Sequence, residues 1–172
     1  MKFPLNPNHS DQHFQDLMLH RVHEILMVAS PYDAFILEED GRLTEQILHE
    51  YQGMNLSYAP RVWQANTASY AMDLLSRRSI DIIIVMMRIL DMDLITFCTR
   101  VKKLYSNKPI ILLAFDESEI KQLPDGWNAF IDNVFIWSGN SHVFAAIIKY
   151  VEDKKNVKRD IRIGDVRVIL LV

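Results

Sequence analysis

Short apolar runs alternate with amphipathic segments along most of the chain. Five runs of five or six residues are rich in branched aliphatic or aromatic side chains, which is typical of strands buried on both faces of a sheet. They cover residues 25–29, 61–65, 81–86, 109–114 and 133–137. The alternation predicts an α/β domain with a five-stranded parallel sheet and helices on both of its faces.

The segments between these runs carry apolar residues at helical spacing, so that one side of each predicted helix faces the sheet. The predicted helices cover residues 32–51, 68–77, 94–105, 118–122 and 142–151. In the first of them Phe35 and Ile36 are expected to face inward, and Thr67 and Ser141 are expected to cap later helices. Because crossovers between parallel strands are right-handed, we expect the doubly wound, flavodoxin-like strand order 2-1-3-4-5.

Two further segments lie outside this alternation. Ser10 and Asp11 are the alternative caps of an extra N-terminal helix that runs towards Glu24. After residue 153 a basic run is followed by a strand-like run at residues 166–172. We therefore divide the chain into an irregular segment with an amphipathic helix (1–24), a central domain (25–153), and a basic linker with the first strand of a following domain (154–172).

Composition and charge limit the classes of partner. The net charge of −3 provides no basic surface for nucleic acid. No apolar run reaches the length of a membrane span, and the first residues lack the apolar stretch of a secretory signal. The single cysteine, Cys98, excludes an internal disulfide and fits a reducing compartment. We expect a cytoplasmic protein that contacts neither nucleic acid nor membrane.

The third predicted strand and the loop after it resemble the signature of response regulator receiver domains, the CheY-like family. In that family an acidic residue opens the strand, a phosphoryl-accepting aspartate ends it, and a loop with a Met-Asp pair follows. Asp81 and the pair Met92-Asp93 match this pattern, and residues 108–114 are similar to the family's fourth strand. The resemblance covers residues 25–153 and implies a bacterial module of signal transduction by phosphorelay.

The positions that would carry receiver chemistry hold other residue types. On the family's pattern, Ala29 and Ser30 stand in place of the acid pair that holds Mg²⁺, and Met86 stands in place of the acceptor aspartate. Ala114 replaces the switch threonine or serine, and Trp137 replaces the lysine. Acyl-phosphate formation needs a carboxylate nucleophile, and Mg²⁺ needs hard oxygen ligands. The resemblance therefore implies a pseudo-receiver: a regulatory module that is no enzyme, binds no cofactor or metal, and acts through protein–protein contacts.

Three acidic residues near these positions are alternative metal ligands. Asp33 lies three residues beyond the missing acid pair, and Asp91 and Asp93 lie in the loop after the third strand. We interpret Asp33 as a first-turn acid that interacts with a helix dipole and Asp93 as the cap of the next helix. On this interpretation none of the three holds a metal.

Two apolar stripes are candidates for an interaction surface. They consist of Phe14, Leu17, Met18 and Val22 in the N-terminal helix, and of Phe144, Ile148 and Val151 in the last helix. The expected partner is another protein, a neighbouring domain of the same longer chain, or a second copy in a homodimer. The first stripe could pack on its own domain or on a second copy. For the second stripe, packing on the domain's own sheet is the favoured alternative.

Two alternatives belong to other functional classes. The run at 166–172 is similar to the first strand of a second receiver, and chains with a similar N-terminal part continue into phosphoenolpyruvate synthase or pyruvate phosphate dikinase-like regions. On that basis the domain would regulate a larger enzyme. In the other alternative it is a small-molecule sensor that uses the crevice at the carboxyl ends of the strands, with Ser30, Met87, Ala114 and Trp137 around it.

Overall fold

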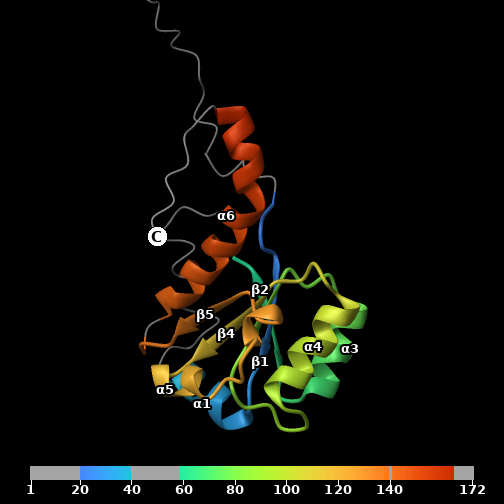
Figure 1. Cartoon of the computed structure of the whole chain (residues 1–172), viewed down its shortest axis with the longest axis vertical. Helices are drawn as coiled ribbons and strands as arrows, with labels where there is room; N and C mark the ends of the chain where they lie inside the picture. The colour runs from blue at the N-terminus through green and yellow to red at the C-terminus, as the bar shows by residue number, and fades with distance from the viewer. Residues whose placement is uncertain (1–19, 40–58, 140, 165–172) are drawn as a thin grey trace, which may run out of the picture.

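Five parallel strands form one sheet in the order β2-β1-β3-β4-β5 (Figure 1). The computed structural model describes residues 20–39, 59–139 and 141–164. Its strands are β1 (Glu24–Val28), β2 (Arg61–Ala65), β3 (Ile82–Val85), β4 (Ile110–Ala114) and β5 (Asn133–Ile136). All four pairings are parallel. The predicted strand positions and the predicted flavodoxin-like order are confirmed.

The described helices follow the strands in the expected alternation. They are α1 (Pro31–Glu39), α3 (Ala68–Arg77), α4 (Leu94–Leu104), α5 (Glu117–Lys121) and α6 (His142–Gly164), with a short 3-10 helix η2 (Trp127–Ala129) before β5. The hydroxyl of Thr67 caps α3 by accepting the backbone N–H of Tyr70 at 3.1 Å. At α1 the hydroxyl of Ser30 accepts the N–H of Asp33 at 3.1 Å, and Pro31 occupies the first turn, where it costs no hydrogen bond.

Successive strand residues point into two separate cores, because side chains alternate between the faces of a strand. Ile25 and Met27 of β1 belong to one core, together with Leu37 of α1 and the inner side of α6. Leu26 and Val28 belong to the other core, with α3 and α4. Figure 1 shows α3 and α4 side by side on one side of the sheet and α6 on the other. Strands covered on both faces account for the continuous apolar runs in the sequence.

The chain before β1 is extended rather than helical. The N–H of Val22 donates to Oε1 of Glu152 at 2.8 Å. The amide of Asn156 accepts the N–H of His20 at 3.0 Å and donates to its carbonyl at 2.9 Å. These side chains of α6 hold backbone groups that a helix would use internally, so the predicted helix does not extend to Glu24. Its other stripe residues, Phe14, Leu17 and Met18, lie outside the described residues.

The last helix is longer than the sequence indicated. The helix expected to end near residue 151 continues without a break to Gly164, and Figure 1 shows it running well past the edge of the sheet. Asn156 is buried within the domain, so the boundary expected at residue 153 does not coincide with a structural break. The strand expected at residues 166–172 lies outside the described residues.

The contact between Glu152 and Val22 predicts a pH-dependent stability. Glu152 is half-buried, and this burial raises the pKa of its carboxyl above the ordinary value. A folded-state pKa above the unfolded one means that the folded protein binds the proton more tightly, so this group's contribution to stability falls as the pH rises through the raised pKa. Glu152→Gln keeps an oxygen that accepts the Val22 N–H and carries no charge.

We therefore expect the free energy of unfolding of the wild type to fall relative to Glu152→Gln as the pH rises from about 4 to about 7. Urea denaturation at several pH values measures this difference. Glu152→Ala, which also loses the acceptor, should be less stable than Glu152→Gln at every pH. A constant difference between wild type and Glu152→Gln across the range would contradict the assignment.

Candidate functional site at the carboxyl edge of the sheet

The positions that correspond to receiver chemistry meet at the carboxyl ends of the strands. Backbone hydrogen bonds continue the parallel ladder one residue beyond the strands themselves. The N–H of Ala29 donates to the Ala65 carbonyl at 3.1 Å, that of Met86 to Val28 at 2.9 Å, and that of Trp137 to Ala114 at 2.7 Å. The strand order places these residues next to one another along one edge of the sheet, at the topological switch point where doubly wound folds bind ligands.

The side chains at this edge are buried and mostly apolar. Met86 is 1% exposed and Trp137 is 6% exposed, and both belong to the core that includes Ala29 and α6. The Trp137 ring packs on Phe144 with centroids 5.8 Å apart. The indole N–H of Trp137 has no hydrogen-bond partner among the described residues. Ala114 is also buried, so these positions lie within the core rather than lining an open polar crevice.

Ser30, the polar member of this set, is used for local structure. Its hydroxyl accepts the Asp33 N–H at the start of α1, and its side chain is buried. A hydroxyl that caps a helix N-terminus satisfies a backbone donor that would otherwise be left unpaired. We therefore assign Ser30 to the helix cap.

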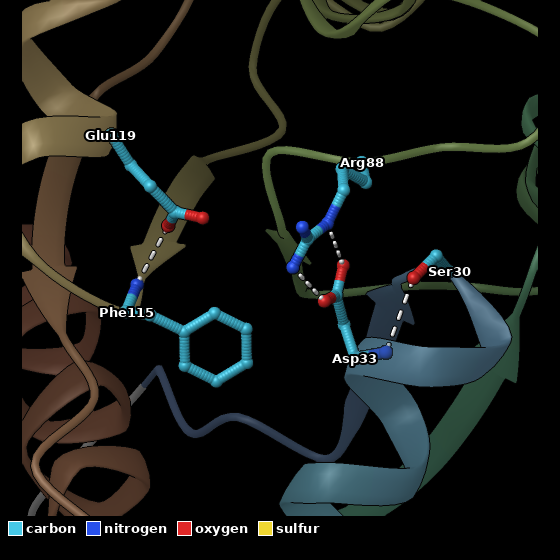
Figure 2. A network of polar contacts seen from close by, with 5 residues as sticks. All are labelled: Ser30, Asp33, Arg88, Phe115 and Glu119. Atoms are coloured by element: carbon cyan, nitrogen blue, oxygen red, sulfur yellow. Dashed lines mark hydrogen bonds and ion pairs between the residues drawn. The ribbon is translucent and has the colours of Figure 1, made fainter.

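Asp33 and Arg88 form an ion pair at this edge of the sheet. Figure 2 shows the Arg88 guanidinium, from the loop after β3, facing the Asp33 carboxylate at the start of α1. Arg88 donates from Nε to Oδ2 at 3.3 Å and from a terminal nitrogen to Oδ1 at 2.6 Å. The Asp33 side chain is 1% exposed, whereas that of Arg88 is 57% exposed. The hydrogen bond and the charge of Asp33 raise the pKa of the Arg88 guanidinium, and such a two-point contact is the stronger class of ion pair.

Asp33 lies on the first turn of α1, as predicted. Its pairing with Arg88 was not predicted. The available signal was a lone arginine directly after a strongly apolar strand. Arg88 also lies over the ring of Tyr32, 5.8 Å from its centroid. The guanidinium therefore joins α1 to the loop after β3.

The two aspartates of that loop cap different helices. Asp93 accepts the N–H of Thr96 at 2.9 Å and caps α4, as predicted. Asp91 instead accepts the N–H groups of Ala68 and Ser69, at 2.6 Å and 3.0 Å, at the start of α3. Hydrogen bonding from Ser69 holds the pKa of Asp91 below its ordinary value. Both carboxylates are engaged at helix N-termini, where negative charge is favoured.

Asp116, in the loop after β4, and Glu119 of α5 also accept hydrogen bonds from backbone N–H groups. Asp116 caps α5 through the N–H groups of Ser118 and Glu119. The carboxylate of Glu119 accepts the Phe115 N–H at 2.8 Å, and Figure 2 shows this contact to the left of the Arg88–Asp33 pair. Among the described residues, no group of three or more His, Cys, Asp and Glu side chains is arranged to hold a metal ion.

The apolar stripes proposed as an interaction surface are part of the fold where the structure describes them. Phe144, Ile148 and Val151 are all buried against the sheet in the core shared with Ala29 and Met86. Val22 is 4% exposed and belongs to the same core. In the folded chain these four residues pack on their own domain, which is one of the alternatives for Val22 and the favoured one for the α6 stripe.

Two remaining sequence features have structural roles. Cys98 is fully buried on the inner side of α4, and burial raises the pKa of its thiol to about 12, so it remains protonated and unreactive at neutral pH. No helix in the described parts of the chain is long and apolar enough to span a membrane.

The Arg88–Asp33 pair predicts a clear effect on stability. Arg88→Ala leaves the buried Asp33 carboxylate without its cation, and we expect a loss of about 2 kcal/mol in the free energy of unfolding, since an unsatisfied buried charged group costs about 1–3 kcal/mol or more. Arg88→Gln combined with Asp33→Asn replaces the pair by two neutral amides and should cost less than Arg88→Ala. Urea denaturation of the three proteins tests this order. A loss below about 0.5 kcal/mol for Arg88→Ala would mean that the contact behaves as an ordinary surface ion pair.

Solved structures of receiver domains share this fold. The signal receiver domain of an HD domain-containing protein from Pseudomonas fluorescens is 20% identical, with a TM-score of 0.53 over 83% of this chain and 95% of that one. The response regulator TrrA from Thermotoga maritima, in complex with Mg²⁺ and BeF, is 17% identical, with a TM-score of 0.56 over 75% of this chain and 98% of that one. A CheY-like receiver domain from Methanospirillum hungatei is 19% identical, with a TM-score of 0.57 over 80% of this chain and 98% of that one. The likeness to CheY-like receivers indicated by the sequence is thus confirmed at the level of the fold.

Comparison of the sequence itself gives no closer relation. No protein-family model matches the chain, and no curated protein matches it.

Proposed function

We propose that this chain is a cytoplasmic, receiver-like signalling module that accepts no phosphoryl group and acts through contacts with another protein or with a neighbouring domain. The observation that supports this most strongly is the buried apolar edge of the sheet. Met86, at the acceptor position, is 1% exposed and lies in the same core as Ala29 and Trp137. A thioether cannot form an acyl phosphate, because that reaction needs a carboxylate nucleophile.

The Arg88–Asp33 pair supports the proposal because it occupies a carboxylate that a metal ion would otherwise use. Phosphoryl transfer onto an aspartate needs a cation that neutralises charge at the reacting oxygens. Asp33 is the buried carboxylate nearest to this edge, and its two oxygens already accept hydrogen bonds from Arg88. A divalent cation would have to displace a guanidinium held at 2.6 Å. The Asp33 carboxylate is therefore already occupied by a side-chain cation, which supports a site without Mg²⁺.

The exposed apolar side chains suit a module that works through protein contacts. Tyr32 and Phe35 of α1 are exposed, as are Leu90 in the loop after β3 and Ile136 at the end of β5. All four belong to elements at or next to the carboxyl edge of the sheet. Exposed apolar side chains that gather at one edge favour an interaction site, although scattered single ones are ordinary on protein surfaces.

The decisive experiment is a titration with Mg²⁺ and beryllofluoride, a mimic of the bound phosphoryl group. The readout is the indole N–H signal of Trp137 in a nitrogen-15 NMR spectrum, assigned with Trp137→Phe. TrrA from Thermotoga maritima, which has been seen with Mg²⁺ and BeF, serves as the positive control. We expect no shift of the Trp137 signal at millimolar Mg²⁺. A saturable shift that requires both Mg²⁺ and beryllofluoride would overturn the proposal.

A further inference from the structure

A second concave site lies at the opposite, amino-terminal edge of the sheet. It is a cavity of about 180 Å³ between α4, the loops that precede β4 and β5, and α6. Pro109 and Val151 contribute apolar surface to its lining. Its other lining residues include Lys102, Lys154, Lys155 and Tyr150.

One lysine of this cavity is already neutralised. The ammonium of Lys102 donates to the Asp132 carboxylate at 2.6 Å and to the Lys108 carbonyl at 2.9 Å. The same oxygen of Asp132 also accepts the Ile110 N–H at 2.8 Å. This half-buried pair is therefore a fixed, electrically balanced part of the wall.

The other two lysines, Lys154 and Lys155, form no ion pair with any residue that the structure describes. Lys154 has one recorded hydrogen-bond partner, the Tyr150 hydroxyl at 3.5 Å, and its ammonium lies 5.6 Å from the centre of the Tyr150 ring. Lys155 makes no hydrogen bond or ion pair with any residue that the structure describes. Two ammonium groups from consecutive residues of α6 thus border one cavity that also contains a tyrosine.

We propose that this cavity binds a small, multiply charged anion that carries a phosphate group. Two lysines and a tyrosine hydroxyl at one cavity supply the charge-assisted donors that phosphate oxygens need. The volume is below the roughly 300–1,000 Å³ of sites for drug-sized ligands, so it selects a compact anion rather than a nucleotide. Charge at a concave surface attracts an anion more strongly than the same charge spread over a convex one.

This site is independent of the proposed function. It lies at the edge of the sheet opposite Met86 and Trp137 and shares no residue with the crevice. Its charge is also local, because the whole chain carries a net charge of −3. Binding here would change the surroundings of α6 at residues 150–155, directly before the part of that helix that runs past the sheet (Figure 1).

Isothermal titration calorimetry with inorganic pyrophosphate tests the proposal, using the whole chain at constant ionic strength. We expect saturable binding of one pyrophosphate per chain. Lys154→Gln combined with Lys155→Gln should weaken it about tenfold or more, since it removes two charged donors, and hydrogen bonds from charged donors are stronger than neutral ones. The matched control is Lys121→Gln combined with Lys149→Gln, which removes the same charge from exposed lysines that do not line the cavity.

Three results of the pyrophosphate titrations would overturn the proposal. They are no heat of binding at millimolar pyrophosphate, equal weakening in both double variants, and binding that rises without saturation. Tyr150→Phe adds a finer readout, because it removes the hydroxyl and keeps the ring; we expect weaker binding with the fold intact by circular dichroism. At mildly alkaline pH inorganic phosphate and sulfate are both mainly dianions, so a comparison of these two distinguishes phosphate recognition from general anion attraction. Equal affinity for phosphate and sulfate would also contradict the proposal.

Discussion

Replacing Met86 with aspartate, which restores the acceptor residue type, is expected to destabilise the protein strongly and to leave it without phosphoryl transfer. Met86 is 1% exposed and surrounded by apolar side chains. The substitution removes a buried thioether and introduces a carboxylate with no cation beside it. Burial of an unpaired charge adds to the cost of the lost packing. We expect a loss of about 4 kcal/mol or more in the free energy of unfolding, which is a large part of the total for a domain of this size.

Met86→Leu is the matched control, because it conserves volume and apolar character and should cost less than about 1.5 kcal/mol. Urea denaturation measures both variants, and mass spectrometry after incubation with a small phosphodonor and Mg²⁺ measures phosphorylation. A folded Met86→Asp variant of nearly wild-type stability that gains one phosphoryl group would show a receiver site lacking only its nucleophile. The proposed absence of a cation site at this edge would then be wrong, although the wild type would still lack a nucleophile.

Replacing Phe144 with alanine should cost about 3–5 kcal/mol in the free energy of unfolding, as is typical of a large aromatic side chain removed from a core. Phe144 is almost completely buried, packs on Trp137 at 5.8 Å and joins α6 to the sheet. If it instead belonged to a surface for a partner, the same change would leave the stability of the isolated chain nearly unaffected. Denaturation followed by tryptophan fluorescence separates the two cases.

Phe35→Ala provides the comparison on an exposed helix face. Phe35 is 56% exposed on α1, and a surface substitution of this kind usually changes stability by less than about 0.5 kcal/mol. A Phe144→Ala variant as stable as Phe35→Ala would contradict the placement of Phe144 in the core. Equal, large losses in both variants would mean that Phe35 also packs against something in the folded chain.

The position of Phe35 also illustrates what the hydrophobic pattern could not decide. Residues 34–37 of α1 are consecutively apolar, so helical spacing alone does not identify the buried side. Phe35 and Ile36 were predicted to face the sheet. In the structure Leu37 is the fully buried residue, and Phe35 is exposed. In α3 polar residues interrupt the apolar ones, and the apolar residues at helical spacing, Ala71, Leu74 and Leu75, are the buried ones.

The candidate site was also predicted only in part from the sequence. The sequence, through the resemblance, located Ala29, Met86, Ala114 and Trp137 at one edge, because strand ends in a parallel sheet of known order must meet there. It did not reveal that Asp91 would cap α3, 22 and 23 residues away in sequence from the donors Ser69 and Ala68. Capping by a residue from another segment leaves no local spacing to recognise.

What the sequence determined by itself is the fold: five apolar runs between amphipathic segments specify the strands, their burial on both faces and hence their parallel order, because these follow from local periodicity and the handedness of crossovers. What only the tertiary structure decided is the use of individual polar groups. The pairing of Arg88 with Asp33 spans 55 residues, and the contacts of His20 and Val22 with Asn156 and Glu152 span 136 and 130. Such contacts depend on where packed elements bring backbone and side chains together, and no periodicity along the chain records them.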